Sequence, residues 1–388
     1  MNIVLPHPVL RAISMLNAAG YEAYLVGGCV RDQLMEKSPV DWDIATSALP
    51  EQTLAVFAEH RTIETGLRHG TVTVILADLP LEITTYRVDG DYTDGRHPDS
   101  VAFTPSLAED LRRRDFTMNA IAFHPDDGFI DPYGGCADIQ QEIIRCVGHP
   151  VKRFAEDSLR ILRGMRFAAT LGFRIEEETA NAIHQRASTL ERVSIERITA
   201  EFKKMICGNF AADILYGFPD VIAVFLPELK IRSIDTFYNA LPNVSRTRLA
   251  ALFRQDDLSL ETVDKALRRL KLDTQTIREV RLLLADYTSI SYDDVGILRL
   301  LNRLGPKLIF DYFAVTSAEE ATVLRTRQLI HAGACFSLAT LAVNGRDLMD
   351  CGISPGPAVG ESLEKLLDAV ISGQCANTKN DLIAYIKK

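Results

Sequence analysis

The sequence predicts an α+β protein in which a mixed β-sheet with helices comes first and an all-α part follows. Helix and strand patterns alternate over about the first 145 residues, whereas strand patterns nearly vanish from about Pro150 onward. The chain has 388 residues, a length that suggests two to three domains and allows sizeable buried cores.

The expected elements of the first part alternate along the chain. They are, in order, a helix over Pro8–Ala19, a strand over Glu22–Val26, a helix after Gly28, a strand around Asp41–Asp43, a helix, and apolar strands over Thr71–Ala77 and Leu81–Tyr86. Ser47 is the expected cap of the third helix, with Pro50 and Glu51 in its first turn. Residues 78–80 are expected to join the last two strands.

Residues 88–104 are rich in Gly, Asp and Pro and are expected to form a long loop. A loop of this length in a compact domain is usually functional or disordered. Helical patterns dominate the rest of the chain, over Glu156–Leu171, Glu176–Ala187, Ser194–Ile206, Leu260–Leu270, Gln275–Asp286, Glu319–Ala332 and Val359–Ile371.

The composition restricts the class of protein. No apolar run approaches the ~18 residues that a membrane span needs, and the first residues lack the basic and apolar regions of a signal peptide. Seven cysteines are scattered without a C-x-x-C pair, which argues against zinc and disulfide frameworks and predicts reduced thiols in the cytoplasm.

The net charge of −9 is unevenly distributed. Arg145–Ile206 contains twelve Lys or Arg against eight Asp or Glu, and Arg246–Arg281 contains nine against six. Basic segments in an acidic chain indicate either a positive surface for a polyanion or ordinary helix solvation. Composition alone leaves both interpretations open.

The most informative pair of residues is Asp41 and Asp43, which flank Trp42 in a predicted strand. Side chains at positions i and i+2 of a strand lie on the same face, so the two carboxylates are expected side by side. A cation relieves their repulsion, and Mg²⁺ is typically held by one or two carboxylates together with substrate phosphates. Two solvated aspartates on an edge strand are the alternative for this pair taken alone.

A glycine turn precedes this pair. Gly27 and Gly28 end an apolar strand and begin a helix that carries Arg31. Glycine lets a backbone approach a ligand closely, and a helix N-terminus favours anions, so the turn can bind a triphosphate. A tight steric turn is the alternative. The turn lacks the pattern of a Walker P-loop.

Glu82 lies in the strand expected beside the one with the two aspartates. A third carboxylate there can ligate a metal ion or help to orient the attacking hydroxyl group. An outward-facing strand residue is the alternative.

Two later segments carry side chains suited to a nucleotide. In Arg113–Ala120, arginine suits triphosphate oxygens, and Asp115 and Asn119 suit ribose hydroxyls. Asp157 and Arg160 are three residues apart at the start of a predicted helix and so share a face, where an acceptor and a fork of donors can read a base edge. A structural ion pair is the alternative.

Together these motifs resemble those of the class II, bacterial type of tRNA nucleotidyltransferase, the CCA-adding enzyme group related to bacterial poly(A) polymerase. The resemblance spans nearly the whole chain, because its spaced motifs occur in order. They are Val26–Asp32, Asp41–Asp43, the loop around Asp91–Pro98, Arg113–Ala120, Asp131–Gly135, Glu156–Arg163, more weakly Glu191–Ile198, and Val343–Leu348 with Gly352 and Pro355–Pro357.

The resemblance implies a polymerase-β-like catalytic head in which Asp41 and Asp43 hold two Mg²⁺ ions, one at the tRNA 3′-hydroxyl and one at the triphosphate. Glu82 is the further expected catalytic residue. The implied nucleotide contacts are Gly27, Gly28 and Arg31 at the triphosphate, Arg114, Asp115 and Asn119 at the ribose, and Asp157 and Arg160, supported by Arg163, at the base of CTP or ATP.

The resemblance also implies four parts: a head (1–145), a helical neck for base recognition (146–206), a helical body (207–274) and a helical tail (275–388). The tail is expected to grip the upper acceptor and TΨC half of tRNA by shape and backbone charge. Neither a membrane nor a stable protein partner is implied.

The implied activity is template-independent addition of C, C and A to the 3′ end of tRNA, with release of pyrophosphate. Family reasoning assigns the switch from C to A to the loop Val88–Thr104, which here carries Asp94 and Arg96; relatives that add only CC look shortened there. The full-length loop therefore favours complete CCA addition or A-only addition, and the motifs do not separate these two. Poly(A) polymerase usually has a long basic C-terminal extension that this chain lacks, and a non-catalytic tRNA-binding protein is expected to lose a metal ligand.

Overall fold

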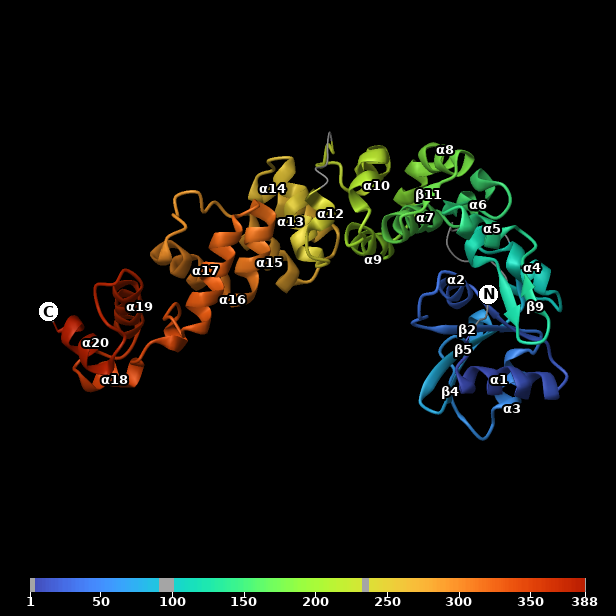
Figure 1. The fold of residues 1–388 in the computed structure, drawn as a ribbon, viewed down its shortest axis with the longest axis horizontal. Helices are drawn as coiled ribbons and strands as arrows, with labels where there is room; N and C mark the ends of the chain where they lie inside the picture. The colour runs from blue at the N-terminus through green and yellow to red at the C-terminus, as the bar shows by residue number, and fades with distance from the viewer. Residues whose placement is uncertain (1–3, 91–100, 232–236, 388) are drawn as a thin grey trace. The chain divides into compact units, whose positions relative to one another are not determined.

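The computed structural model describes residues 4–90, 101–231 and 237–387. The chain forms two compact units that divide between Asn239 and Ala240 (Figure 1). This division falls inside the segment 207–274, which the sequence predicts as one body, and the four-part division stays a prediction.

The N-terminal unit contains a seven-stranded sheet with the order β3-β4-β5-β2-β1-β8-β9. β2 and β5 are parallel and the other neighbouring strands are antiparallel, so the sheet is mixed, as predicted. Its strands are β1 (Ala23–Val26), β2 (Trp42–Thr46), β3 (Arg61–Ile63), β4 (Thr71–Leu76), β5 (Leu79–Thr85), β8 (Ala122–His124) and β9 (Gly128–Ile130).

Strand β5 begins earlier than the sequence predicts. A two-residue turn, Ala77–Asp78, joins β4 to β5, and both of its residues have positive φ (47° and 62°). Two left-handed residues in a row match the right-handed twist of a hairpin. The strand therefore includes Leu79 and Pro80, which were expected in the connection.

Helices accompany the sheet and continue after it in this unit. They are α1 (His7–Ala18), α2 (Gly28–Leu34), α3 (Pro50–Val56), α4 (Leu107–Arg112), α5 (Gly135–Gln140), α6 (Pro150–Glu156), α7 (Leu159–Leu171), α8 (Glu177–Arg186), α9 (Ile195–Ile206), α10 (Ala211–Gly217) and α11 (Pro219–Phe225), with 3₁₀ turns η1 (Leu67–His69), η2 (Thr117–Asn119) and η3 (Ala187–Arg192).

The expected cap of α3 is wrong. Leu49, not Ser47, occupies the N-cap position, and the side chain of Gln52 accepts a hydrogen bond from the Leu49 N–H group. Ser47 instead accepts a bond from the backbone N–H of Glu22, at the edge of β1. The serine therefore secures the strand pair β1–β2 rather than the helix.

The helix predicted over Glu156–Leu171 begins at Leu159. Asp157 has extended backbone angles (φ −137°, ψ 106°) that end α6, and its Oδ1 accepts a hydrogen bond from Leu159 N–H at 3.0 Å. The carboxylate thus caps α7, because an Asp side chain satisfies an otherwise unpaired N–H of a helix start. Their spacing predicts that Asp157 and Arg160 lie on one continuous helix. In the structure, however, Asp157 precedes α7 and only Arg160 belongs to it.

The sheet and the following helices are joined through their own backbone. Strand β10 (Ile143–Ile144) pairs in parallel with β11 (Arg174–Ile175), which follows α7. Phe116 pairs with Cys146 in an isolated bridge. These contacts bring the segment after α4 close to α7, which positions the site described below.

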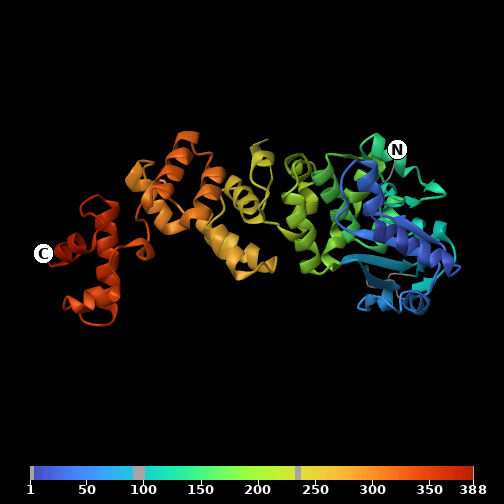
Figure 2. The same cartoon turned by 60° about the horizontal axis from the view of Figure 1, so that its bottom comes forward.

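The C-terminal unit is helical, as predicted, with no strand among its residues 240–387 (Figure 2). Its helices are α13 (Ser245–Gln255), α14 (Leu260–Arg269), α15 (Thr274–Leu284), α16 (Asp294–Thr316), α17 (Glu320–His331), α18 (Gly345–Asp350), α19 (Pro357–Ile371) and α20 (Lys379–Ile386), with the 3₁₀ turn η4 (Leu338–Thr340); α12 (Phe237–Ala240) lies at the division. The sequence reading missed α16, because Gly305 (φ 76°) and Pro306 interrupt its pattern with a kink.

In residues 4–90, 101–231 and 237–387, no helix is both long enough and apolar enough to cross a membrane.

Candidate functional site

The predicted carboxylates meet at the start of β2. Asp43 is the second residue of this strand and is half-buried, whereas Asp41 directly precedes the strand and is exposed. Strand β5 lies parallel to β2 with Glu82 in register with Asp43. Paired residues of neighbouring strands lie on the same face, so Glu82 accompanies Asp43 as the sequence predicts.

The environment of Asp43 disfavours its charged form. Burial raises the pKa of this carboxyl group to about 6, and the neighbouring carboxylates of Glu82 and Asp41 add to the rise, whereas Arg114 opposes it. A cation bound at this edge removes the penalty, since it stabilises the charged carboxylate. This donor set of carboxylate oxygens fits a hard divalent ion.

The protein supplies few metal ligands by itself. Among the described residues, no group of three or more His, Cys, Asp or Glu side chains is placed to hold a metal ion. Asp41 and Asp43 thus stay the predicted protein ligands of a metal ion. The catalytic role predicted for Glu82 stays a prediction.

Gly27 occupies the centre of the site. It lies between β1 and α2 with φ 76° and ψ −133°, a conformation that favours glycine. A Cβ atom at this position would lie 3.0 Å from Arg114 Nη1 and 3.7 Å from Asp43 Oδ2. The glycine turn, Arg114 and Asp43 therefore converge on one small space, and none of the described side chains caps the first turn of α2.

Arg31 extends from α2 toward the 3₁₀ turn η2. Its Nη1 donates to Asn119 Oδ1 at 2.8 Å, and its Nε and Nη2 donate to Asp32 Oδ1 at 2.9 and 2.7 Å. At Gly28, the nearest atom to an added Cβ would be Arg31 Nη2, at 3.8 Å. The residues predicted to bind the triphosphate, Gly27, Gly28 and Arg31, thus lie together.

Asp115 is the most constrained carboxylate of the site. Its Oδ1 accepts bonds from Asn119 Nδ2 (3.0 Å) and Phe116 N–H (2.8 Å), and its Oδ2 accepts from Arg163 Nε (2.8 Å) and Nη2 (2.7 Å). Burial alone would raise the pKa of Asp115, but Arg163 and the bond from Asn119 outweigh it and hold the pKa far below its usual range. Asp115 also raises the pKa of Arg163. Two residues predicted at the ribose and one predicted at the base thus form one network.

Arg114 depends on a residue to which the sequence reading assigned no role. Asp110 is only 1% exposed. Its Oδ2 forms an ion pair with Arg114 Nη2 at 3.2 Å, and its Oδ1 forms one with Arg113 Nη2 at 2.8 Å. Although burial raises the pKa of Asp110, the two guanidinium groups lower it overall. The only available signal was its place four residues before Arg114 on a predicted charged helix end, a spacing that brings side chains together.

The side chains predicted to read the base are bound within the protein. Asp157 Oδ2 accepts from Arg197 Nη2 at 3.0 Å. Arg160 is buried; its Nη1 donates to Glu156 Oε2 (2.6 Å) and its Nη2 donates to the carbonyl oxygen of Arg113 (2.9 Å). Base recognition by Asp157, Arg160 and Arg163 remains a prediction.

The predicted loop residues Asp94 and Arg96 lie outside the described residues. The loop prediction over Val88–Thr104 is wrong at both ends, where β6 (Arg87–Asp89) and β7 (Val101–Phe103) pair in an antiparallel arrangement. The backbone N–H of Arg87 donates to Asp110 Oδ1 at 3.3 Å. The backbone of β6 and the side chain of Arg114 therefore both bind Asp110.

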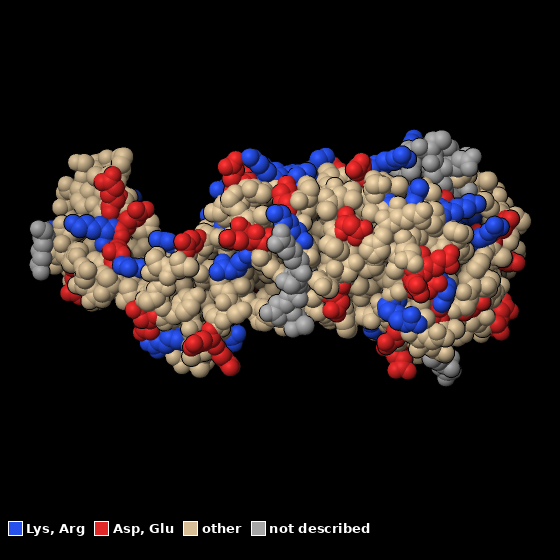
Figure 3. Space-filling view, turned by 90° about the horizontal axis from the view of Figure 1, so that it is seen from above, with Lys and Arg blue, Asp and Glu red and all other residues tan. Residues whose placement is uncertain are grey.

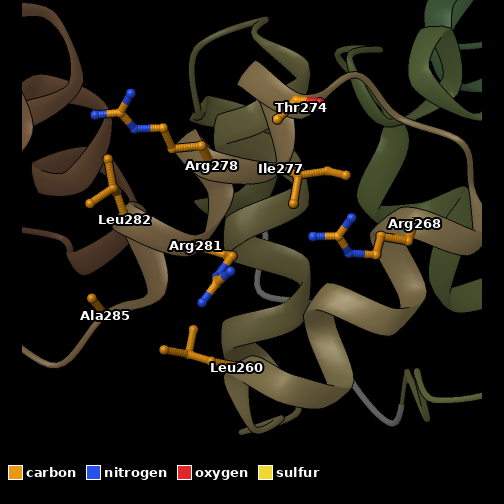
Figure 4. A pocket seen from close by; sticks show the side chains of 8 residues that line it. All are labelled: Leu260, Arg268, Thr274, Ile277, Arg278, Arg281, Leu282 and Ala285. Atoms are coloured by element: carbon orange, nitrogen blue, oxygen red, sulfur yellow. The ribbon is translucent and has the colours of Figure 1, made fainter.

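The C-terminal unit has a separate pocket of about 360 Å³ between α14 and α15 (Figure 4). Three arginines line it, Arg268, Arg278 and Arg281, hereafter the pocket arginines. Asp264 pairs with Arg268 Nε (2.7 Å) and Arg281 Nη1 (3.3 Å). In Figure 4 Arg268 extends toward the middle of the pocket and Arg281 points toward Leu260, whereas Arg278 points away from both. Elsewhere, Figure 3 shows Lys and Arg intermixed with Asp and Glu.

Three protein families match consecutive parts of the chain. Residues 23–145 match the family described as poly A polymerase head domain, and residues 172–218 match the RNA and SrmB-binding site of polymerase A. Residues 243–386 match tRNA nucleotidyltransferase domain 2. The first of these ranges contains the aspartate pair, the glycine turn and Asp115.

Relatives match over almost the whole length. The CCA-adding enzyme of Geobacillus kaustophilus is 38% identical, with 97% of this chain and 95% of the relative covered, and that of Leuconostoc mesenteroides is 34% identical with 97% and 94% covered. The crystal structure of the Bacillus stearothermophilus CCA-adding enzyme in complex with CTP superimposes with a TM-score of 0.83 at 33% identity, covering 99% of this chain and 98% of that one.

Proposed function

Because this chain belongs to the CCA-adding enzyme family, we propose that it adds the 3′-terminal CCA to tRNA from CTP and ATP and releases pyrophosphate. The observation that carries the proposal is the convergence of Gly27, Arg114 and Asp43 within 4 Å of one point. A phosphate-binding turn beside a metal-binding carboxylate is the arrangement that nucleotidyl transfer needs.

The carboxylates prepare the site for a divalent metal. We propose that Asp41 and Asp43 hold Mg²⁺, with two ions in the complete site. When bound, the ions lower the pKa of the attacking 3′-hydroxyl and neutralise charge on the triphosphate. The protein's own contribution is the Asp43 carboxyl group, whose burial and neighbouring carboxylates raise its pKa and so disfavour the charged form in the absence of a cation.

The remaining residues bind and orient the nucleotide. Arg31 and Arg114 are placed to contact triphosphate oxygens, because each guanidinium lies beside the glycine turn. Asn119 is held from both sides, by Arg31 and Asp115, so its amide is preorganised for a ribose hydroxyl. Preorganised contacts lower the entropic cost of binding.

Base selection is proposed for the break between α6 and α7. Asp157 and Arg160 flank this break, and Arg163 follows one turn later. Their protein partners here are a carboxylate, an arginine and backbone carbonyls. A nucleotide base that binds these side chains must replace some of their bonds within the protein. A base is therefore selected only when its own hydrogen bonds to them are as good as the bonds that it displaces.

The C-terminal unit is proposed to hold tRNA. The pocket arginines present positive charge beside the apolar residues Leu260 and Leu282. Phosphate groups of an RNA backbone suit arginine forks, and such contacts are largely independent of sequence. The match of residues 243–386 to a tRNA nucleotidyltransferase domain favours tRNA over general poly(A) synthesis.

The test offers three tRNAs, ending at the discriminator base, after C, and after CC, with CTP, ATP or both, and Mg²⁺. Growth of the first tRNA by C, C and A, followed by a stop, is expected. Extension of only the CC-ending tRNA by one A would instead make the protein an A-adding enzyme with a separate CC-adding partner. Long A tails on any RNA would support poly(A) polymerase.

A matched variant separates catalysis from tRNA binding. Asp43→Ala is expected to abolish incorporation and to leave tRNA affinity unchanged, because the aspartate lies on β2 of the head. A variant that retains full turnover would refute the metal assignment. Loss of tRNA binding with normal folding would contradict the separation of the two roles.

A further inference from the structure

One aromatic ring lies among three arginines of the site. Phe167, on α7, is 4% exposed. The Cζ atoms of Arg166, Arg31 and Arg163 lie 3.8, 5.0 and 5.6 Å from the centre of its ring. Each distance is within the range in which a guanidinium is attracted by the negative face of an aromatic ring.

The same ring closes a circuit of hydrogen bonds. Arg31 binds Asn119, Asn119 binds Asp115, and Asp115 binds Arg163. Phe167 contacts the first and last members of this series, from a helix that is more than a hundred residues away from Arg31 in sequence. The ring therefore couples α2, which carries the triphosphate side of the site, to α7, which carries the base side.

The position requires an aromatic ring rather than any apolar side chain. Three guanidinium groups repel one another here, although each also pairs with a carboxylate, Arg31 with Asp32, Arg163 with Asp115 and Arg166 with Glu201. The π-face supplies negative potential at the centre of the cluster, which an aliphatic side chain cannot do. The edge-to-face contact with Phe116, at 5.9 Å between ring centres, fixes the tilt of the ring.

We propose that Phe167 is a positioning residue for nucleotide binding and selection, since its ring holds Arg31 and Arg163 in one mutual arrangement. This inference rests on the proposed function, in which Arg31 contacts the triphosphate and Arg163 supports base recognition. Loss of the ring face lets the two arginines move independently. Nucleotide affinity and discrimination between CTP and ATP then fall together, while the metal-binding carboxylates stay in place.

The test compares Phe167→Leu with Phe202→Leu. Phe202 is fully buried on α9 and makes an edge-to-face contact with Phe225 at 5.2 Å, so its replacement removes a core ring of the same unit whose aromatic contact is with Phe225. Both variants are expected to lose stability. Only Phe167→Leu is expected to raise KM for CTP and ATP, by about 3- to 30-fold, the range that a lost cation–π contact allows.

Three further readouts keep the test decisive. In Phe167→Leu, kcat at saturating nucleotide changes less than KM, and misincorporation of A on a tRNA ending in a single C increases. Phe167→Tyr keeps the ring face and should restore KM, and Phe167→Met replaces Phe167→Leu if the latter does not fold. Equal KM values for the Phe167 and Phe202 variants, or a loss of kcat alone, would overturn the proposal.

Binding of CTP by calorimetry separates this inference from the proposed function. If the wild-type protein binds CTP but extends none of the tRNAs, the proposed function fails, and the comparison of CTP affinities still tests Phe167. If the wild-type protein extends tRNA and Phe167→Leu binds CTP as tightly as Phe202→Leu does, only the role of Phe167 fails.

Discussion

Replacing Asp43 by Asn should stabilise the metal-free protein while it abolishes activity. The pKa of Asp43 rises from its ordinary value of 3.8 to about 6, because the side chain is largely buried beside Glu82 and Asp41. Such a group weakens the fold whenever it is ionised. Asparagine has nearly the same shape and carries no charge, so it removes this penalty.

The size and the pH range of the effect follow from the shift. Below about pH 4 the carboxyl group is protonated in both folded and unfolded chains, so the variant gains nothing there. Between about pH 4 and 6 the unfolded chain is ionised and the folded chain is not, so the stability of the wild type falls as the pH rises. Above about pH 6 the penalty is complete, and a shift of about two units corresponds to about 2 to 3 kcal/mol.

Trp42 provides the assay. It is the only tryptophan in the chain, it is buried, and it adjoins Asp43, so its fluorescence reports unfolding of the N-terminal unit. Urea titrations with a chelator present should give Asp43→Asn a higher free energy of unfolding at pH 7.5 and an equal one near pH 4. Adding Mg²⁺ should stabilise the wild type and leave the variant unchanged.

Asp41→Asn is the matched control. Asp41 is exposed, so its replacement should change the stability of the metal-free protein much less, while activity is still lost if it is a metal ligand. Equal free energies of unfolding for the wild type and Asp43→Asn at pH 7.5 would refute the argument that the ionised Asp43 destabilises the fold when no cation is bound.

Further predictions concern the glycine turn, the buried carboxylate and the pocket. Gly27→Ala should cost about 1 kcal/mol through its positive φ and weaken CTP binding, because the new Cβ lies 3.0 Å from Arg114 Nη1, whereas Gly128→Ala, with positive φ but open space, should cost stability alone. Calorimetry with CTP distinguishes them, and equal CTP affinities would contradict the role of the turn. Asp115→Asn should lower the free energy of unfolding by about 2 kcal/mol at pH 7, because Arg163 loses its anionic partner. Because the folded protein holds the pKa of Asp115 far below its ordinary value of 3.8, this stabilisation is complete at any pH above 3.8 and disappears only in strong acid. The tryptophan signal measures it, and an unchanged urea midpoint would refute it. Replacing all pocket arginines by Gln should reduce the salt dependence of tRNA binding by about 2 to 3 in the slope of log K against log salt, and an unchanged slope would remove the pocket from the RNA-binding surface.

Much of the fold was predictable because its signals are local. The strand around Asp43, the glycine turn before α2 and the helices α7, α8, α9, α14, α15, α17 and α19 follow from periodicity and turn residues alone, whereas the other helices after Pro150 were not predicted. The errors have two physical causes, a bond supplied by another part of the chain and a local break inside a helix. Ser47 binds Glu22 instead of capping α3, and the kink at Gly305 concealed α16.

The chemical character of the site was determined by the sequence itself. The spacing of Asp41 and Asp43 and the position of Gly27 before a helix are properties of adjacent residues, and together they predict a metal site and a phosphate site before any folding is considered. The resemblance of the spaced motifs then indicated the family, and the relatives confirm it.

Only the tertiary structure decided which side chains support one another. Asp110 holds Arg114, Asp115 joins Asn119 to Arg163, and Phe167 lies among three arginines from α2 and α7. Asp110 and Arg114 are only four residues apart, as are Asp115 and Asn119, but Arg163 and Phe167 reach Asp115 and Arg31 from distant segments, so no local pattern reveals those contacts. The surroundings also set the pKa of each aspartate. Burial and neighbouring carboxylates raise the pKa of Asp43, whereas Arg163 lowers the pKa of Asp115 although that side chain is buried as well.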